Sequence, residues 1–252
     1  MSDTFTNKVA IVTGATSGIG KATAIAFAQA GAKVAIAGRR AEEGAAVVRE
    51  IEQGGGEALF VRTDVSREAD VAALVAKTVE RFGRLDFAFN NAGVFLDAGP
   101  VTGASEDLFT KTFGINVGGV LYGMKHQIPA ILKSGGGAIV NCASVLGMVA
   151  VPNAAVYNAS KFAVIGLTKT AALEYSVQGV RINAVCPAVI ETDMTSGMRS
   201  DSQMHDGLRA MHPIGRFGKS EEIAAAVLYL CSPGASFTTG IALPVDGGLT
   251  AQ

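Results

Sequence analysis

Three residues whose side chains could share proton-transfer chemistry lie close together in the middle of the chain. Ser144 is followed thirteen residues later by Tyr157, and Lys161 comes four residues after the tyrosine. Residues four apart in a helix lie on the same face, so the phenol and the ammonium would share one pocket. A tyrosine hydroxyl ordinarily has a pKa of about 10, and a nearby positive charge favours the phenolate. The pattern indicates general acid/base catalysis, although a lone Y-x-x-x-K also occurs on ordinary surface helices.

Strands and helices in regular alternation must position these side chains. Short β-branched runs alternate with alanine-rich stretches along the whole sequence, which is typical of βαβ units. The predicted fold is α/β: a Rossmann-like, doubly wound, seven-stranded parallel sheet with helices on both faces, in one domain of residues 1–252. The predicted strands are residues 9–13, 33–37, 57–62, 85–90, 137–142, 180–186 and 241–245.

Five helices are predicted between these strands, at residues 18–30, 41–53, 67–82, 106–133 and 154–178. Tyr157 and Lys161 fall in the first two turns of the last of these, for which Asn153 is the expected N-cap. Residues 188–218 show no clear periodicity and contain four methionines, so an irregular substrate lid is expected there.

A glycine-rich turn, Thr-Gly-Ala-Thr-Ser-Gly-Ile-Gly, joins the first predicted strand to the first predicted helix. In this context Gly14 permits a sharp turn, Gly18 lets the backbone approach a pyrophosphate, and Gly20 lets the helix pack closely. The exposed amides at the helix start then bind the anion. No Lys-Ser/Thr pair closes the turn as in a Walker A loop, which disfavours nucleotide hydrolysis.

The amino-acid composition excludes some classes of binding partner. Lys and Arg number 21 against 22 Asp and Glu, so no net basic field favours nucleic acid or an anionic membrane. No apolar run approaches the length of a membrane span, and the N-terminus lacks a signal peptide, so a cytoplasmic protein is expected. The three cysteines lie far apart in apolar segments, as buried thiols do, and neither they nor the three histidines show metal-ligand spacing; no metal is expected.

Several motifs in one order carry a family resemblance. The chain resembles the short-chain dehydrogenase/reductases over about residues 5–250, through the glycine-rich turn, Asn90-Asn91-Ala92-Gly93, Asn116, Ser144, Tyr157, Lys161, Pro187 and the closing Val-Asp-Gly-Gly. This resemblance implies four catalytic residues. Tyr157 would be the general acid/base, Lys161 would hold the nicotinamide ribose and keep the phenol acidic, and Ser144 would bind the substrate oxygen. Asn116 would support a water chain from the lysine, or serve only at a helix kink.

The resemblance also implies a nicotinamide cofactor. Gly38 stands where an acidic residue normally accepts the adenosine ribose hydroxyls, and Arg39 follows it. NADP(H) is therefore expected, with Arg39 paired to its 2′-phosphate, while NAD(H) stays possible and the arginines could be only solvated charges. The expected cofactor contacts are Gly14, Thr16, Ser17, Gly18, Ile19, Gly20, Arg39, Arg40, Asp64, Val65, Asn91, Ala92, Gly93, Tyr157, Lys161, Pro187, Val189, Ile190 and Thr192.

The residues that border the expected substrate pocket are mostly apolar. They are Phe95, Val145, Leu146, Met148, Asn153, Met194 and Met198, and they predict a small to medium ketone or secondary alcohol with little charge. An alternative is a 3-oxoacyl-carrier-protein reductase, although Leu173 stands where those enzymes commonly carry Arg. A non-catalytic, cofactor-binding sensor is a third reading, against which the complete catalytic set argues. The family resemblance further implies a homotetramer.

Overall fold

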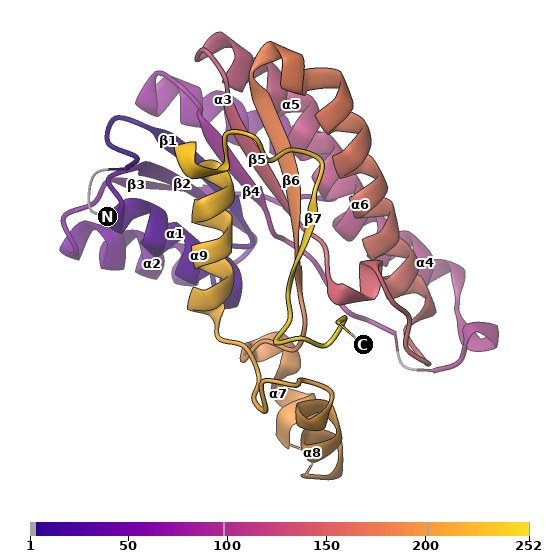
Figure 1. Ribbon diagram of the computed structural model, residues 1–252. Helices are drawn as coiled ribbons and strands as arrows, with labels where there is room; N and C mark the ends of the chain where they lie inside the picture. The colour runs from indigo at the N-terminus through magenta and orange to yellow at the C-terminus, as the bar shows by residue number, and fades with distance from the viewer. Residues whose placement is uncertain (1–3, 98, 201, 252) are drawn as a thin grey trace.

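Seven parallel strands run through the centre of the described molecule (Figure 1). The computed structural model describes residues 4–97, 99–200 and 202–251, apart from the side chains of residues 198–204. The strand order is β3-β2-β1-β4-β5-β6-β7, which confirms the predicted doubly wound, Rossmann-like sheet. The strands are β1 Val9–Thr13, β2 Lys33–Gly38, β3 Ala58–Arg62, β4 Phe87–Asn90, β5 Gly137–Cys142, β6 Val180–Pro187 and β7 Ala242–Val245.

The strand order reverses at β1, which pairs with β2 on one side and with β4 on the other. Thr13 lies opposite Ala37 and Val12 lies opposite Phe89, so the three strands end at one level. Parallel sheets bind ligands in the crevice beyond the carboxyl ends of strands at such a reversal. The topology therefore directs the glycine-rich turn and the segment after β4 into one crevice.

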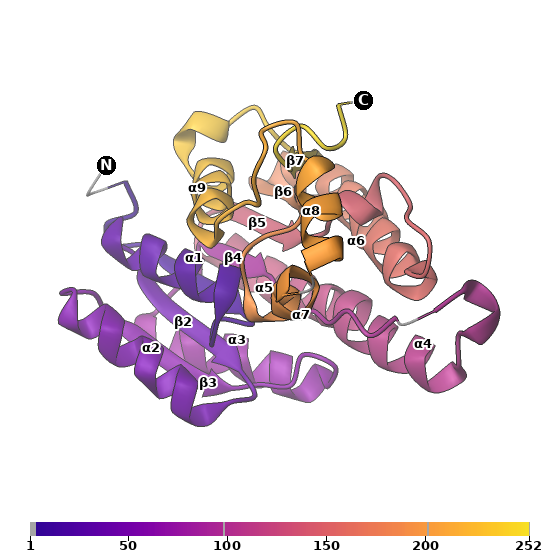
Figure 2. The ribbon, with the colours of Figure 1, turned by 90° about the horizontal axis from the view of Figure 1, so that it is seen from below.

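Helices cover both faces of the sheet, as predicted (Figure 2). One buried cluster joins the sheet to α1 (Gly18–Gln29), α2 (Ala41–Gln53) and α9 (Ser220–Cys231). A second cluster joins the opposite face to α3 (Glu68–Phe82), α5 (Gly119–Lys133) and α6 (Ala155–Tyr175). Within the described residues, no helix combines the length and the apolar character needed to cross a membrane.

The predicted helix at residues 106–133 is interrupted. It begins as α4 (Glu106–Phe113), continues as a π-helical turn at Gly114–Gly118, and resumes as α5. Three glycines at positions 114, 118 and 119 weaken the ordinary helix there, and π-helical turns often mark functional positions. Asn116 lies inside this turn and is buried.

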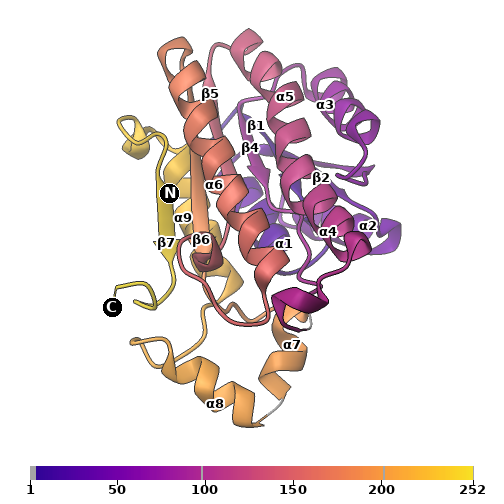
Figure 3. The same cartoon turned by 90° about the vertical axis from the view of Figure 1, so that its right-hand side faces the viewer.

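The expectation of an irregular segment at residues 188–218 is wrong, because two short helices occupy much of it. They are α7 (Asp193–Ser200) and α8 (Ser202–Ala210), which lie beyond the carboxyl edge of the sheet (Figures 1 and 3). Glycines at positions 197 and 207 and several serines lower the helix propensity and hid the pattern. A role for the segment as a substrate lid stays a prediction.

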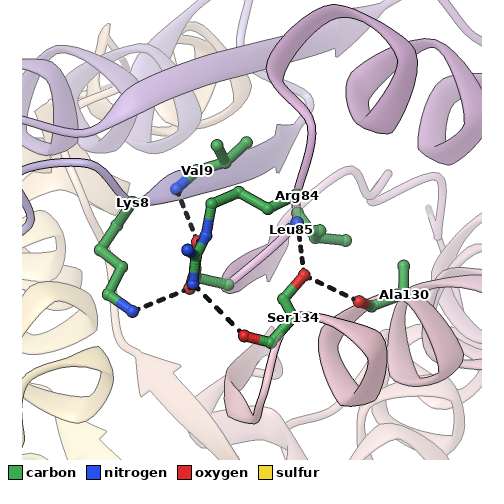
Figure 4. Close-up of polar contacts among 7 residues, drawn as sticks. Lys8, Val9, Arg84, Leu85, Ala130 and Ser134 are labelled. Atoms are coloured by element: carbon green, nitrogen blue, oxygen red, sulfur yellow. Dashed lines mark hydrogen bonds and ion pairs between the residues drawn. The ribbon is translucent and has the colours of Figure 1, made fainter.

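A buried carboxylate ties the opposite edge of the sheet together (Figure 4). Asp86 is fully buried and accepts hydrogen bonds from the Lys8 ammonium, the Val9 amide and the Arg84 guanidinium, at 2.6 to 3.0 Å. Arg84 also donates to the carbonyl oxygen of Ser134 at the end of α5. The N-terminal ends of β1 and β4 and the C-terminal end of α5 are thereby joined through Asp86 and Arg84.

Candidate active site

A cleft of about 430 Å³ lies at the carboxyl edge of the sheet, at the strand-order reversal. It contains most of the predicted cofactor contacts, but Gly20, Tyr157, Lys161, Pro187, Val189 and Ile190 are not in its wall. Six residues that were not among the expected cofactor contacts also line it: Gly38, Thr63, Val94, Ile115, Asp193 and Met194. The lining residues are Gly14, Thr16, Ser17, Gly18, Ile19, Gly38, Arg39, Arg40, Thr63, Asp64, Val65, Asn91, Ala92, Gly93, Val94, Ile115, Thr192, Asp193 and Met194.

The glycine-rich turn has the conformation that its sequence predicts. Gly14 and Gly18 adopt φ values of +65° and +53°, where side chains other than glycine are strained. A Cβ on Gly20 would collide with the carbonyl oxygen of Gly14, so close packing of α1 requires this glycine too. Ser17 precedes the helix without capping it through its side chain, which leaves the first amides of α1 available for an anion.

Arg40 forms hydrogen bonds to the glycine-rich turn. Its guanidinium donates to Thr16 Oγ1 at 2.9 Å and to Ser17 Oγ at 2.7 Å. Arg39, by contrast, lies between the main cleft and a neighbouring cavity lined also by Arg62 and Arg67. The two arginines therefore present positive charge at different points of the adenosine end of the cleft.

Asp64 places a negative charge at the same end of the cleft. A hydrogen bond from the Ser66 hydroxyl lowers the pKa of the Asp64 carboxyl, and Arg39 and Arg67 act in the same direction. The carboxylate is therefore ionised at neutral pH and faces the cleft beside Arg39.

Side-chain bonds hold the segment after β4 against the end of β1. The amides of Asn91 and Ala92 donate to Thr13 Oγ1, and Asn91 Nδ2 donates to the Thr13 carbonyl oxygen at 3.0 Å. Thr13 opens the glycine-rich turn in the sequence but was not among the predicted site residues. Its contacts fix the two walls of the crevice relative to each other.

Tyr157 and Lys161 share one face of α6, as their spacing predicts. The Lys161 ammonium lies 5.4 Å from the centre of the Tyr157 ring. Lys161 is buried, and Nζ donates to the carbonyl oxygen of Cys142 at 2.9 Å, at the end of β5. A buried positive charge therefore lies next to the Tyr157 ring.

Asn116 lies beside the same lysine. Its Oδ1 accepts from the Val94 amide at 2.8 Å, while Nδ2 donates to the Val94 carbonyl oxygen and to Ser160 Oγ. A Cβ added to Gly93 would lie 3.2 Å from Asn116 Oδ1 and 3.6 Å from Lys161 Nζ, so both atoms border one point. The π-helical turn thus serves the expected backbone role and also brings an amide oxygen close to the ammonium.

Ser144 follows β5 and occupies the adjoining part of the carboxyl edge. Its hydroxyl donates weakly to the carbonyl oxygen of Pro187, at 3.4 Å, and accepts from the Leu146 amide at 3.1 Å. The strands β5 and β6 pair up to Cys142 and Val185, which brings the two segments together. A hydroxyl held by one long bond can be redirected toward a substrate oxygen.

Loop 94–97 contacts Tyr157 in two ways that the sequence did not reveal. The Phe95 ring meets the Tyr157 ring edge to face, with centroids 4.8 Å apart. Asp97 accepts hydrogen bonds from the amides of Val156 at 2.9 Å and Tyr157 at 3.1 Å. Asn153 is not the N-cap of α6, contrary to expectation, because it adopts a φ of +64° one residue too early and makes no cap bond.

The remaining predicted pocket residues differ in exposure. Val145 is buried and Leu146 half-buried, while Met148 and Met194 are 39% and 53% exposed. Only Met194 also lines the main cleft. Met198 belongs to the residues whose side chains are not described, so its predicted contact lies outside the description.

Val189 and Ile190 border a second, smaller cavity of about 70 Å³ instead of the main cleft. Ile190 is buried and packs in the hydrophobic cluster with α9. The amide of Val189 donates to His212 Nε2 at 3.4 Å, and His212 Nδ1 lies 2.8 Å from the Leu208 carbonyl oxygen. This imidazole joins the segment after β6 to α8.

The cysteines are buried thiols, as expected. Burial raises the pKa of the Cys186 thiol to about 12. Burial also raises the pKa of Cys142, which Lys161 opposes, and that of Cys231 to about 12. Protonated thiols are poor nucleophiles, so these side chains serve packing.

Comparisons with known proteins agree with this geometry. A family described as Enoyl-(Acyl carrier protein) reductase matches residues 14–250. A short-chain type dehydrogenase/reductase from Mycobacterium ulcerans has a similar structure, with a TM-score of 0.96 and 31% identity over 99% of this chain and 92% of that one. The chain belongs to the short-chain dehydrogenase/reductases.

Two relatives within the short-chain dehydrogenase/reductases have informative names. Cyclohexanol dehydrogenase of Acinetobacter sp. (strain SE19) is 41% identical over 252 residues, which cover 100% of this chain and 98% of the relative. A 2,5-dichloro-2,5-cyclohexadiene-1,4-diol dehydrogenase of Sphingobium indicum is 44% identical over 253 residues, covering 100% of both chains. This short-chain dehydrogenase/reductase is accordingly an NAD(P)-dependent oxidoreductase that acts on the CH–OH or C=O group of a small molecule.

Proposed function

We propose that this enzyme interconverts a mostly apolar cyclic secondary alcohol and its ketone, with NADP(H) as the preferred cofactor and Tyr157 as the general acid/base. The observation that carries the proposal is that the Tyr157 ring contacts both the Lys161 ammonium, 5.4 Å from its centre, and the Phe95 ring, with centroids 4.8 Å apart. A charge that activates the phenol and an apolar wall for the substrate thus meet at one residue. Both named relatives act on ring alcohols, according to their names.

The residues around the phenol suit ketone reduction and its reverse. The nicotinamide ring, when bound, gives or takes the hydride. Tyr157 donates its phenolic proton to the ketone oxygen as negative charge develops there, and takes the proton back during alcohol oxidation. The Lys161 ammonium stabilises the phenolate that remains, and the Ser144 hydroxyl donates a hydrogen bond to the same substrate oxygen. Proton return from solvent passes the Lys161 and Asn116 polar atoms.

The cleft fits such a cofactor through the positive-φ glycines, the exposed amides of α1 and the arginines at the adenosine end. Assays of the wild-type enzyme with cyclohexanol, cyclohexanone, an acyclic ketone and an acetoacetyl thioester test the substrate class. The ring compounds are expected to give the highest kcat/KM. A preference for the thioester would instead support a carrier-protein reductase. The structure disfavours that function at Leu173, which is 86% exposed and offers no positive charge to an acidic carrier protein.

The preference for NADP(H) is supported at the end of β2. Gly38 supplies no carboxylate to bind ribose hydroxyls, and a Cβ there would lie 2.7 Å from the Thr16 methyl group. Arg39 and Arg40 both line the adenosine end of the cleft. Guanidinium groups bind phosphate strongly, whereas the Asp64 carboxylate repels the 2′-phosphate of NADP(H). The attraction of the two arginines for this phosphate must therefore exceed the repulsion from one carboxylate.

Replacing Arg39 tests this preference. Arg39→Ala is expected to lower the ratio of kcat/KM with NADPH to kcat/KM with NADH by about tenfold, because a charge-assisted phosphate bond is lost. Arg67→Ala is the matched control, because Arg67 borders only the neighbouring cavity and is largely exposed. A wild-type enzyme that prefers NADH, with no change in Arg39→Ala, would overturn the assignment.

Self-association, expected from the family resemblance, has support in exposed aromatic and aliphatic side chains. Phe109, Leu121 and Phe162 are 45% to 50% exposed on α4, α5 and α6. Exposed apolar side chains mark protein contacts when they gather into one patch, which is what assembly through these helices requires. We infer a homotetramer of the 25.7 kDa chain, and light scattering after gel filtration measures it. A monomeric mass at micromolar concentration would exclude this assembly.

A further inference from the structure

The first turn of α6 has no cap of its own. An α-helix begins with amides that have no partner inside the helix, and a Ser, Thr, Asp or Asn at the N-cap usually accepts from one of them. Here the N-cap position is Ala154, no side chain of the flanking residues caps the helix, and its first turn contains no acidic residue. In the helix that contains Tyr157, the residues close in sequence therefore supply neither an acceptor for the first amides nor a negative charge at the positive end of the helix dipole.

A carboxylate from a distant loop accepts hydrogen bonds from these amides. Asp97 accepts from the Val156 amide with one oxygen and from the Tyr157 amide with the other, at 2.9 and 3.1 Å. The second of these bonds is made to the main chain of Tyr157 itself. Both bonds are charge-assisted and link loop 94–97 to a helix some sixty residues later in the chain.

The same loop contacts two other parts of the active site. The Val94 amide and carbonyl are both bonded to the Asn116 side chain, and the Phe95 ring packs on the Tyr157 ring. Gly93 and Val94 also line the cofactor cleft. Loop 94–97 is therefore fixed at its start by Asn116 and at its end by α6.

We propose that Asp97 is a positioning residue for Tyr157: its carboxylate sets the depth and direction of the first turn of α6, and so places the phenol against loop 94–97 and the cleft. This inference rests on the proposed role of Tyr157 as general acid/base. Displacement of a reacting group by about 1 Å can cost on the order of 100-fold in rate, so a two-bond cap matters for kcat. Cofactor affinity should depend on it much less than kcat, because the glycine-rich turn and the arginines at the adenosine end lie on other elements.

Substitution of Asp97 tests the proposal through kcat and KM. Asp97→Ala is expected to lower kcat for ketone reduction on the order of 10- to 100-fold, while the dissociation constant of the cofactor stays within about twofold. Asp97→Asn keeps one acceptor oxygen and should restore part of the lost kcat. Asp107→Ala is the matched control. Asp97 and Asp107 both line a groove beside α4, but among the described residues Asp107 pairs only with Lys111 of its own helix.

Amide hydrogen exchange measures the stability of the start of α6 without depending on turnover. Peptides that cover residues 154–160 should exchange faster in Asp97→Ala than in the wild type, and not in Asp107→Ala. Unchanged exchange in this region, or a wild-type kcat in Asp97→Ala, would overturn the positioning role. An equal loss of cofactor affinity and kcat would show general unfolding instead and also count against it. If the wild-type enzyme reduced no ketone, the proposed function would fail, and the exchange result would still decide whether Asp97 holds the helix.

Discussion

Tyr157→Phe is expected to lower kcat for ketone reduction by about 1000-fold, because phenylalanine has no proton to transfer to the substrate oxygen. The substitution keeps the ring, so the edge contact with Phe95 and the position beside Lys161 should persist. Steady-state rates with cyclohexanone and each reduced cofactor measure the effect. Cofactor binding, followed by fluorescence titration, should change by no more than about threefold.

A second tyrosine on the same helix provides the control. Tyr175 lies at the C-terminal end of α6 and packs against the hydrophobic cluster, remote in sequence from the catalytic turn. Tyr175→Phe removes the same hydroxyl group and should leave kcat near the wild-type value. Equal activity of Tyr157→Phe and Tyr175→Phe would contradict the catalytic assignment and favour a role for Tyr157 in packing alone.

Asp86→Asn is expected to destabilise the enzyme by about 3 kcal/mol, the largest effect on stability that we predict. The substitution removes the charge that Lys8 and Arg84 share and turns one acceptor into a donor beside them. Buried charges that lose their partner are costly, although the partial exposure of both cations reduces the loss. Equilibrium unfolding in urea measures the change, provided that the transition is reversible.

The comparison for this stability effect is Asp206→Asn. Asp206 is exposed, and among the described residues its carboxylate pairs with the neighbouring imidazole of His205, so its substitution should cost less than about 0.5 kcal/mol. Because Asp86 lies at the edge of the sheet opposite the cleft, kcat of folded Asp86→Asn at low temperature should remain near the wild-type value. Equal urea midpoints of unfolding for Asp86→Asn and Asp206→Asn would show that the charged cluster around Asp86 contributes little to stability.

Sequence periodicity predicted the sheet almost completely. Each strand was placed to within two residues, because strands buried on both faces form short β-branched runs bounded by glycine or polar residues. The spacing of Tyr157 and Lys161 likewise predicted one helix face, since that relation is local. Local geometry of this kind is determined by residues close in sequence.

Features that depend on distant contacts were missed. Asp97 caps α6 from another loop, and nothing in the residues around Asp97 indicates that partner. Asn153 was a sound local candidate for the cap, but the chain enters the helix with Asn153 in a left-handed conformation. Ile190, an expected cofactor contact, is buried in the cluster with α9, and its main chain pairs with Gly218; its contact with a cofactor stays a prediction. Tertiary contacts, rather than propensity, decide these positions.

The strand order has a consequence for synthesis of the chain. β1 leaves the ribosome before β2 and β4, yet it needs both strands as neighbours, and the Thr13 to Asn91 hydrogen bonds join β1 to the segment after β4. A nascent chain that ends before β4 exposes one edge of β1, which is open to pairing with another chain. The cleft is incomplete until the segment that follows β4 has emerged, because Asn91, Ala92 and Gly93 line it.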